Sequence, residues 1–473
     1  MTSTELRPAR AMPATSAGTD RDHAFDVIRS MCLIVVVLLH GMMAGIERTD
    51  AGPSITNAMS GNDWFNPVSW FVQVMPLFFI AGGFTGLLQW DRHVRRGGTA
   101  AGFVARRMQR LLPPAIAMIV AVGVVLWLLG VVGIDSALLA EVGFRIGQPL
   151  WFLAVFTGVT ALVPVMATFH RRHAGLTLLG LASVVLLVDV VAGIMQQPGI
   201  AYANLLFVWL FIQQLGFCLA DGSVDAVPRW SLPIVAAAFL GILFGLVAAG
   251  AYPADMYANL NPPVLPLVLL GCAHAALVQW ARPWLSGVYE RHHGFAHLVS
   301  WIGARSMTIY AWHMPAMVLL GLVTLTGSWM SPAVHSEAWW WTRPLWLVAV
   351  VLVLIPFVIV LSPLERFGFL GLPGVQRLKW SMRSAERTRA LLRGEALDRW
   401  MLPRGLAGVA AVLGATCATA SITALLVFGF NASSTLISLG LAVAAMLLVA
   451  RIPTTLPGQP SEASRASTPV VGD

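Results

Sequence analysis

The feature that most constrains this chain is a series of long apolar runs, each close to the ~20 residues that a helix needs to cross a bilayer. The approximate bounds of these runs are 26–46, 66–90, 111–132, 149–168, 174–195, 200–220, 231–251, 260–281, 298–324, 343–363, 403–430 and 434–451. Short polar segments separate them. The sequence therefore predicts an all-α polytopic integral membrane protein.

Composition supports this fold class and excludes others. The 473 residues are 57% hydrophobic and 11% charged, whereas soluble domains carry roughly 45–50% apolar and ~25% charged residues. A soluble enzyme, a disordered protein and a disulfide-stapled secreted domain are thereby excluded. The four cysteines are scattered singly without a CxxC pair, so we expect neither a disulfide framework nor a metal site.

The distribution of basic residues predicts the orientation in the membrane. If the N-terminus is cytoplasmic, only Arg48, Arg145 and Arg343 of the 30 basic residues fall in outer segments, and 30 − 3 = 27 fall in inner ones. The positive-inside rule then places both termini in the cytoplasm of a multi-pass protein of the inner (plasma) membrane. The net charge of +8 is explained by this bias, so we expect no nucleic-acid partner. Lys379 is the sole lysine, and such arginine usage indicates a GC-rich bacterial genome.

The predicted organisation has five parts. Residues 1–21 form a disordered cytoplasmic leader, 22–365 a ten-helix domain, 366–402 a basic amphipathic segment at the inner leaflet, 403–452 two further transmembrane helices, and 453–473 a disordered tail. The last two helices are rich in small residues and carry no ionisable residue before Arg451, which favours helix packing rather than chemistry. We therefore expect a chain that ends at Arg366 to insert and keep measurable activity, though with lower stability or altered association with partners.

The first span carries Arg29 and His40, and ionisable residues inside a bilayer are functional candidates. Arg29 stands at the cytoplasmic end and His40 eleven residues later, which is about three turns, so both lie on one helix face ~16 Å apart. A neutral imidazole at this depth can accept a proton from a hydroxyl or amine. The alternative is that Arg29 is an orientation anchor and His40 a packed polar residue.

A group of arginines precedes the third span in the segment ARRMQRLLPP. Arg106, Arg107 and Arg110 lie within about one turn, and residues spaced i, i+3 can converge on one anion. Guanidinium groups suit phosphate and pyrophosphate. Ordinary positive-inside bias explains the same residues without a ligand.

Two further segments carry candidate residues. IGARSMTIYAWHMPAM places Arg305 at the inner end of the ninth span, with Tyr310 and His313 one and two turns deeper. QPLWFLAVF begins the fourth span and contains Trp151, for which an aromatic-belt anchor is the more common role.

Five motifs in this order resemble the membrane-bound acyltransferase 3 family, the bacterial O-acyltransferases that modify surface sugars, lipids and secondary metabolites. They are Arg29-x10-His40, PLFFIAGGF with Gly82 where the family commonly has Ser, RRMQRLLPP, PLWFLAVF and IGARSMTIYAWHMP. The resemblance covers about residues 22–365 and leaves the amphipathic segment and the last two helices outside.

The resemblance implies an enzyme that transfers a short acyl group, with acetyl first among the candidates, from cytoplasmic acyl-CoA to an acceptor hydroxyl or amine. No bound cofactor is implied, because acyl-CoA is a co-substrate. His40 would be the catalytic histidine, Arg29 would orient it or bind the donor, and the acyl-CoA phosphates would lie on Arg106, Arg107 and Arg110 with help from Arg305. Tyr310, His313 and Trp151 would contact the oxyanion or the acceptor.

Several alternatives stay open at this point. His40 could activate the acceptor directly or carry the acyl group itself. The acceptor could be a carbohydrate, a glycolipid or another small molecule in contact with the lipid bilayer. The main rival function is a multi-helix transporter that exports a small molecule or a lipid-linked product. The apolar runs carry no conspicuous network of carboxylates, and the arginines before the third span are suited to binding phosphate. Both observations favour the enzyme over the transporter.

Overall fold

The computed structural model describes residues 22–49, 52–325, 332–367 and 402–452. The predicted leader 1–21, the predicted tail 453–473 and nearly all of the predicted amphipathic segment 366–402 lie outside these residues. The elements run in the order α1 (His23–Met43), β1 (Ala44–Thr49), β2 (Gly52–Asn57), α2 (Phe65–Val72), α3 (Met75–Arg95), α4 (Ala100–Val131), α5 (Ser136–Gly147), α6 (Leu150–Ala161), α7 (Val163–Ile194), α8 (Pro198–Ala201), α9 (Asn204–Ala220), η1 (Arg229–Ser231), α10 (Leu232–Ala248), α11 (Leu265–Arg291), α12 (His293–Gly303), α13 (Ser306–Thr324), α14 (Glu337–Phe367), α16 (Arg404–Phe428) and α17 (Ala432–Ala450).

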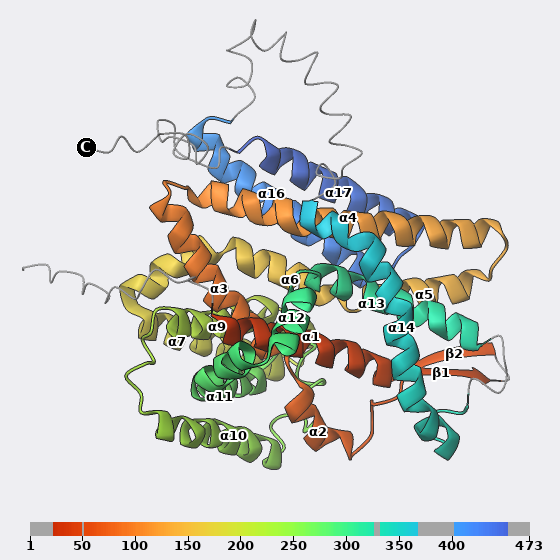
Figure 1. Cartoon of the computed structure of the whole chain (residues 1–473), viewed down its shortest axis with the longest axis horizontal. Helices are drawn as coiled ribbons and strands as arrows, with labels where there is room; N and C mark the ends of the chain where they lie inside the picture. Colours follow the sequence, from red (N-terminus) through yellow and green to blue (C-terminus); the bar gives the residue numbers. More distant parts are fainter. Residues whose placement is uncertain (1–21, 50–51, 326–331, 368–401, 453–473) are drawn as a thin grey trace, which may run out of the picture.

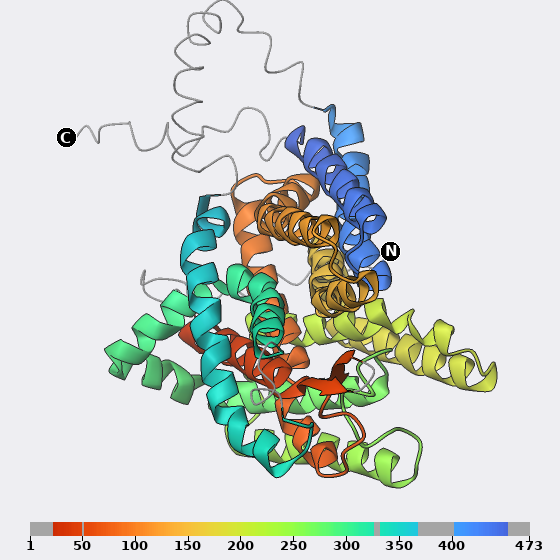
Figure 2. The same ribbon diagram turned by 90° about the vertical axis from the view of Figure 1, so that its right-hand side faces the viewer.

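The prediction of an all-α polytopic membrane protein is confirmed. Within the described residues, 12 helical segments are long and apolar enough to span a bilayer. The second segment is broken between α2 and α3, and the fourth is built from α5 and α6. The run expected at 298–324 is divided at Ala304 and Arg305 into α12 and α13. Figure 1 shows the helices gathered into one bundle, and Figure 2 shows the same bundle from the end that carries the strands.

The first span is followed by a two-stranded hairpin, where the sequence predicted only a short outer loop. β1 and β2 pair antiparallel, with Gly45 opposite Thr56 and Ile46 opposite Ile55. Arg145 of α5 donates a hydrogen bond from its Nη2 atom to the Ile55 carbonyl at 2.6 Å, and its Nε donates to Glu141 at 2.6 Å. These bonds tie the hairpin to α5. We refer to this end of the bundle as the hairpin end. The opposite end, where Arg29, Arg107 and Arg110 lie, is called the arginine end.

Helix α1 lies inside the bundle and contacts α3, α11, α12, α13 and α14. Its first turn is capped by Asp22, whose carboxylate accepts from the Ala24 amide at 2.9 Å and from Arg282 Nε at 2.6 Å. A side chain oxygen at this position satisfies an amide that the helix leaves unpaired. At the other end, Trp346 donates to the Gly41 carbonyl at 3.0 Å. Both ends of α1 are therefore fixed by other helices.

Gly83 of the PLFFIAGGF motif permits close packing of α3 against α9. A side chain at Gly83 would meet the Gln213 carbonyl oxygen of α9, and one at Gly216 would meet the Ile80 carbonyl of α3. The α3 and α9 backbones therefore approach each other where neither helix carries a Cβ atom.

Replacing Gly83 with alanine should lower the midpoint of thermal unfolding, because the new methyl group would meet backbone that cannot rotate away. Overpacking of this kind costs ~1–3 kcal/mol. Gly180→Ala is the matched control, since nothing lies within 4 Å of a Cβ at that helical position. Thermal unfolding followed in detergent would check this, and equal midpoints for the two variants would contradict the packing argument.

The last two helices form an antiparallel pair that packs on α4, α5 and α6. Ser421 donates to the Ser438 carbonyl at 2.8 Å within the pair, and Gln109 of α4 donates to the Val449 carbonyl at 3.4 Å. The Phe430 amide donates to the Gly143 carbonyl of α5 at 3.2 Å. The pair is thus joined to the domain by side chains and by backbone.

Candidate active site

The structure brings together two histidines that lie 273 residues apart in the sequence. His40 is in the last turn of α1, and His313 is in the middle of α13. The Nε2 atom of His313 lies 3.3 Å from the Nδ1 atom of His40. The two histidines expected in separate helical columns therefore form one hydrogen-bonded pair.

His313 is held from behind by its own helix. Its Nδ1 atom lies 2.6 Å from the Tyr310 carbonyl oxygen, and the side chain is buried. A carbonyl oxygen only accepts, so the proton of a neutral His313 resides on Nδ1 and its Nε2 atom is an acceptor. The hydrogen bond with His40 is therefore donated by His40 Nδ1, which leaves His40 Nε2 with a lone pair.

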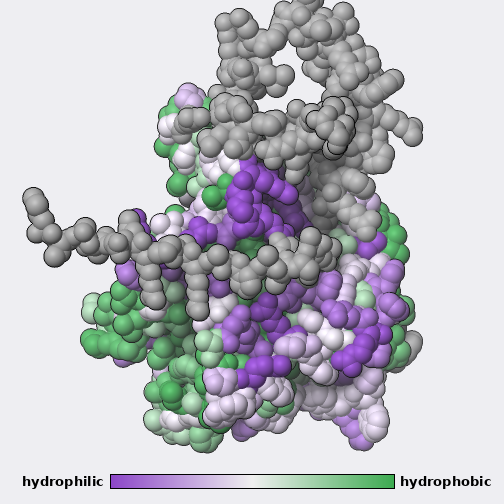
Figure 3. Space-filling model, turned by 60° about the vertical axis from the view of Figure 1, so that its left-hand side comes forward, coloured by the Kyte–Doolittle hydropathy of each residue, from purple (hydrophilic) through white to green (hydrophobic). Residues whose placement is uncertain are grey.

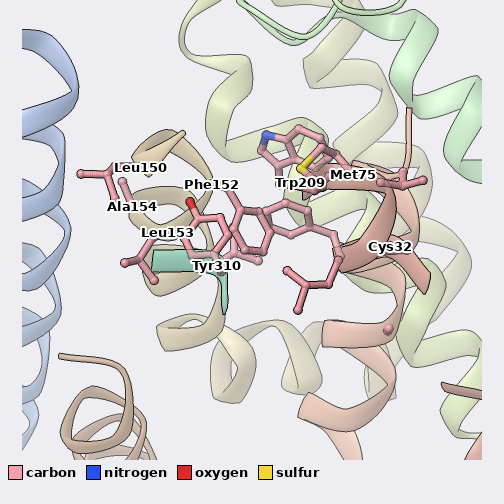
Figure 4. Packing of buried hydrophobic residues seen from close by; sticks show 14 of the residues in the cluster. Cys32, Met75, Leu150, Phe152, Leu153, Ala154, Trp209 and Tyr310 are labelled. Atoms are coloured by element: carbon pink, nitrogen blue, oxygen red, sulfur yellow. The ribbon is translucent and has the colours of Figure 1, made fainter. Parts of the chain in front are cut away.

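Tyr310 supports the pair rather than facing the reacting groups. Its hydroxyl donates to the Pro149 carbonyl, where α6 begins, and its ring packs edge-on against Phe152 at 5.2 Å between centroids. Figure 4 shows Tyr310 beside Phe152 and Leu153 of α6. Because a phenol has one proton to donate, Tyr310 has none left for an oxyanion.

His40 lies on the wall of a cavity of about 620 Å³ toward the hairpin end. Residues of α1, the hairpin, α5, α13 and α16 enclose this space, and Trp151 of α6 also lines it. His313 and Tyr310 stand behind His40 and do not line the cavity. Of the three expected oxyanion or acceptor contacts, the structure therefore places only Trp151 at the cavity surface.

Three arginines gather near the other end of α1. Arg107 of α4 lies within the electrostatic influence of both Arg110 and Arg29. The Arg107 guanidinium lies 5.5 Å from the Phe103 ring centroid, and its buried Nε atom has no hydrogen-bond partner among the residues that the structure describes. Like charges repel one another, and an anion between them would relieve the repulsion. We call Arg29, Arg107 and Arg110 the arginine cluster.

Arg106 and Arg305 each contact an aromatic side chain. Arg106 contacts the His93 ring of α3, and His93 bonds in turn to the Thr99 carbonyl at 2.8 Å. Arg305 stacks on Trp301 at 4.5 Å and donates to its carbonyl at 3.2 Å. These contacts connect α3 with α4, and α12 with α13.

Figure 3 shows the face of the molecule that lies on the left-hand side of Figure 1. Hydrophilic residues gather at the centre of this view, and hydrophobic residues lie at its margins.

Two other groups of polar side chains in the bundle are hydrogen-bonded to one another and therefore have a structural explanation. His170 of α7 bonds to Gln214 at 2.9 Å and to Asp221 at 3.0 Å. Burial alone would raise the pKa of the Asp221 carboxyl, but hydrogen bonds from His170 and Ser223 lower that pKa below its ordinary value. Asp189 accepts from Asn204 at 2.8 Å and from Tyr252 at 2.9 Å. In the described segments, no three His, Cys, Asp or Glu side chains are grouped to hold a metal ion.

Several cavity residues were not recognised from the sequence. Thr56, Arg145, Gln148 and Thr423 supply polar atoms to the cavity lining. Arg145 was counted only as one of three outer arginines, and Gln148 had a weak signal as the residue before the PLWFL motif. Thr423 lies in a helix with no motif, so no sequence signal pointed to it.

The fold and the site define a polytopic membrane protein with a histidine pair beside an enclosed apolar space. The acyltransferase 3 domain matches residues 22–363. The chain belongs to the acyltransferase 3 family and is a membrane acyltransferase. No curated protein and no solved structure matches it.

Proposed function

We propose that this protein transfers a short acyl group, acetyl first among the candidates, from acyl-CoA bound at the arginine end to a hydroxyl or amine of an acceptor in the cavity. The arginine end would face the cytoplasm of a bacterial inner membrane, as the positive-inside rule predicts. The observation that carries the proposal is the hydrogen-bonded pair of His40 and His313, with His40 on the cavity wall.

The donor site follows from the arginine cluster. Guanidinium groups bind phosphate through charge-assisted hydrogen bonds, and the buried Nε atom of Arg107 lacks a partner that a phosphate oxygen would supply. Arg29 and His40 are eleven residues apart on one helix, or ~16 Å. An extended pantetheine arm has a comparable length, so a thioester could lie near His40 while the phosphates lie on the arginines.

The histidine pair supports general base catalysis. His313, fixed by the Tyr310 carbonyl, accepts from His40 Nδ1, and His40 Nε2 takes the proton of the acceptor hydroxyl. The acceptor oxygen forms a bond to the thioester carbonyl carbon, the carbon–sulfur bond breaks, and the coenzyme A thiolate takes the proton from His40. The same Nε2 lone pair could attack the thioester instead and form an acyl-histidine; ping-pong kinetics would indicate that route.

Arg107→Ala should raise the KM for acetyl-CoA by roughly ten- to hundredfold and change kcat little. The loss of a charge-assisted contact is worth ~1.5–3 kcal/mol, and this contact would be the same in the ground and transition states. The control is Arg172→Ala, which removes an exposed arginine of α7 that is not part of the arginine cluster. Initial rates with purified protein would measure both constants. An unchanged KM for Arg107→Ala would show that this arginine has no role in donor binding.

His313→Ala should lower kcat by ~10–100-fold, as for other partners that orient an imidazole, and leave the KM for acetyl-CoA unchanged. His313→Gln should recover part of the activity, because an amide oxygen can accept the hydrogen bond from His40 Nδ1. A role in packing alone predicts no such rescue, so equal kcat values for the two variants would contradict the positioning role.

A transporter remains the functional alternative to exclude by experiment. Purified protein in detergent, without any ion gradient, should hydrolyse acetyl-CoA slowly and transfer the acetyl group when an acceptor is present. Release of free coenzyme A can be followed with a thiol reagent. A protein that moves a solute across vesicles and never consumes acetyl-CoA would refute the proposed function.

A further inference from the structure

One wall of the cavity is built by a helix outside the family domain. The acyltransferase 3 domain match ends at residue 363, yet Thr423, Leu426 and Val427 of α16 line the cavity together with His40. These residues lie in the last turns of α16, next to the short link to α17. The match with the family therefore does not account for this part of the cavity.

The cavity offers an apolar surface to its occupant. Its apolar lining includes Met43 and Ile46 beside the hairpin end of α1, Met314 and Met317 of α13, and Leu426 of α16. Among the polar residues, Arg145 already donates to Glu141 and to the Ile55 carbonyl. Thr56, Gln148 and Thr423 also line the cavity, but a free sugar placed against its apolar part would lose hydration at its hydroxyl groups, and burial of a hydroxyl without a partner costs roughly 1–3 kcal/mol.

The cavity rim carries large side chains that are exposed on the surface of the bundle. Phe144 of α5 is 41% exposed, Tyr202 after α8 is 46% exposed and Val427 of α16 is 58% exposed, and all three line the cavity. These positions come from three different helical segments. α16 lies at the outer edge of the bundle when it is viewed from the hairpin end (Figure 2). The cavity therefore reaches the surface of the bundle beside these three side chains, and the apolar outer surface of a membrane-spanning bundle is the part that contacts lipid.

We infer that the acceptor is an amphiphile, with an apolar body that lies against α16 and a hydroxyl-bearing head at His40, and that it enters sideways from the bilayer between Phe144, Tyr202 and Val427. This inference rests on the proposed function for the identity of the reacting head, but the binding of the apolar body is a separate property. α16 is then the element that selects the acceptor.

The first experiment tests binding without requiring turnover. The full chain in lipid nanodiscs is irradiated with an alkyl glucoside that carries a diazirine in its dodecyl chain, and labelled peptides are identified by mass spectrometry. Labelling should fall on α16 near Leu426 and on α5 near Phe144, and unlabelled dodecyl glucoside should suppress it whereas free glucose should not. Labelling that dodecyl glucoside does not suppress, or that falls only on helices that do not line the cavity, would overturn the inference.

A pair of variants locates the binding surface. Leu426→Trp fills the cavity wall and should reduce the suppressible labelling by about tenfold, the order expected for a change in an apolar pocket. Leu436→Trp on α17 is the control at a similar depth, because Leu436 is 70% exposed and does not line the cavity, and it should label as the unmodified chain does. Equal labelling of both variants would refute α16 as the binding wall.

Acetyl-CoA hydrolysis by the same nanodisc preparation distinguishes the proposed acyltransferase function from the proposed amphiphile site. Suppressible labelling without any hydrolysis would refute the proposed function and leave the amphiphile site standing. Hydrolysis without suppressible labelling would refute the amphiphile site and leave the acyltransferase in place.

Discussion

Replacing His40 with alanine should reduce acyl transfer by about a thousandfold, because the variant loses the one group placed to take the acceptor proton. The side chain lines the cavity and is hydrogen-bonded to His313. Alanine in the last turn of α1 removes no buried charge and costs the bilayer nothing, so expression and membrane insertion should be normal. Transfer of a radiolabelled acetyl group in purified protein is the appropriate measurement.

A second membrane-embedded histidine provides the matched control for this variant. His274 lies in α11 and does not line the cavity, and its Nδ1 atom has no hydrogen-bond partner within the described part of the chain. His274→Ala should therefore keep most of the activity. Retention of more than about a tenth of the turnover by His40→Ala would be incompatible with general base catalysis by this residue.

Ending the chain at Arg366 should abolish acyl transfer, in contrast to the expectation drawn from the sequence. The last two helices cover buried residues of α4, including Ala105, Met108 and Leu112, and α16 supplies part of the cavity wall. Removing them exposes that surface to lipid and opens the cavity on one side. Exposed small and apolar residues would still allow insertion, so the loss should appear in activity and thermal stability rather than in membrane targeting.

Co-expression distinguishes lost packing from a failure of synthesis. A chain of residues 1–402 should be inactive alone and regain activity when residues 403–473 are supplied as a separate polypeptide, because helices that insert independently can associate within the bilayer. Activity of the shortened chain in the absence of the second polypeptide would show that α16 is dispensable and would restore the boundary suggested by the sequence.

The sequence alone predicted the transmembrane architecture well, because insertion depends on local hydrophobicity. A stretch of ~20 apolar residues spans a bilayer whatever surrounds it, and the predicted runs correspond to the 12 helical segments of the described chain. The helix geometry also placed Arg29 and His40 on one face before any tertiary contact was known. The hairpin of Ala44–Thr49 and Gly52–Asn57 was not predicted, since its strands are short and depend on contacts with α5 and α14.

Only the tertiary structure decided how the candidate residues act together. The pairing of His40 with His313 joins residues 273 positions apart, and the use of the Tyr310 hydroxyl by Pro149 depends on where α6 begins. Likewise, no sequence motif marked α16. Its residues Thr423, Leu426 and Val427 line the cavity because the helix packs on α4 and α6 through small residues. Hydropathy and helical periodicity are properties of one segment, whereas hydrogen-bond partners and cavity walls depend on which segments meet in space. The candidate residues could therefore be proposed from the sequence, whereas the side chains that contact them were set by helix packing.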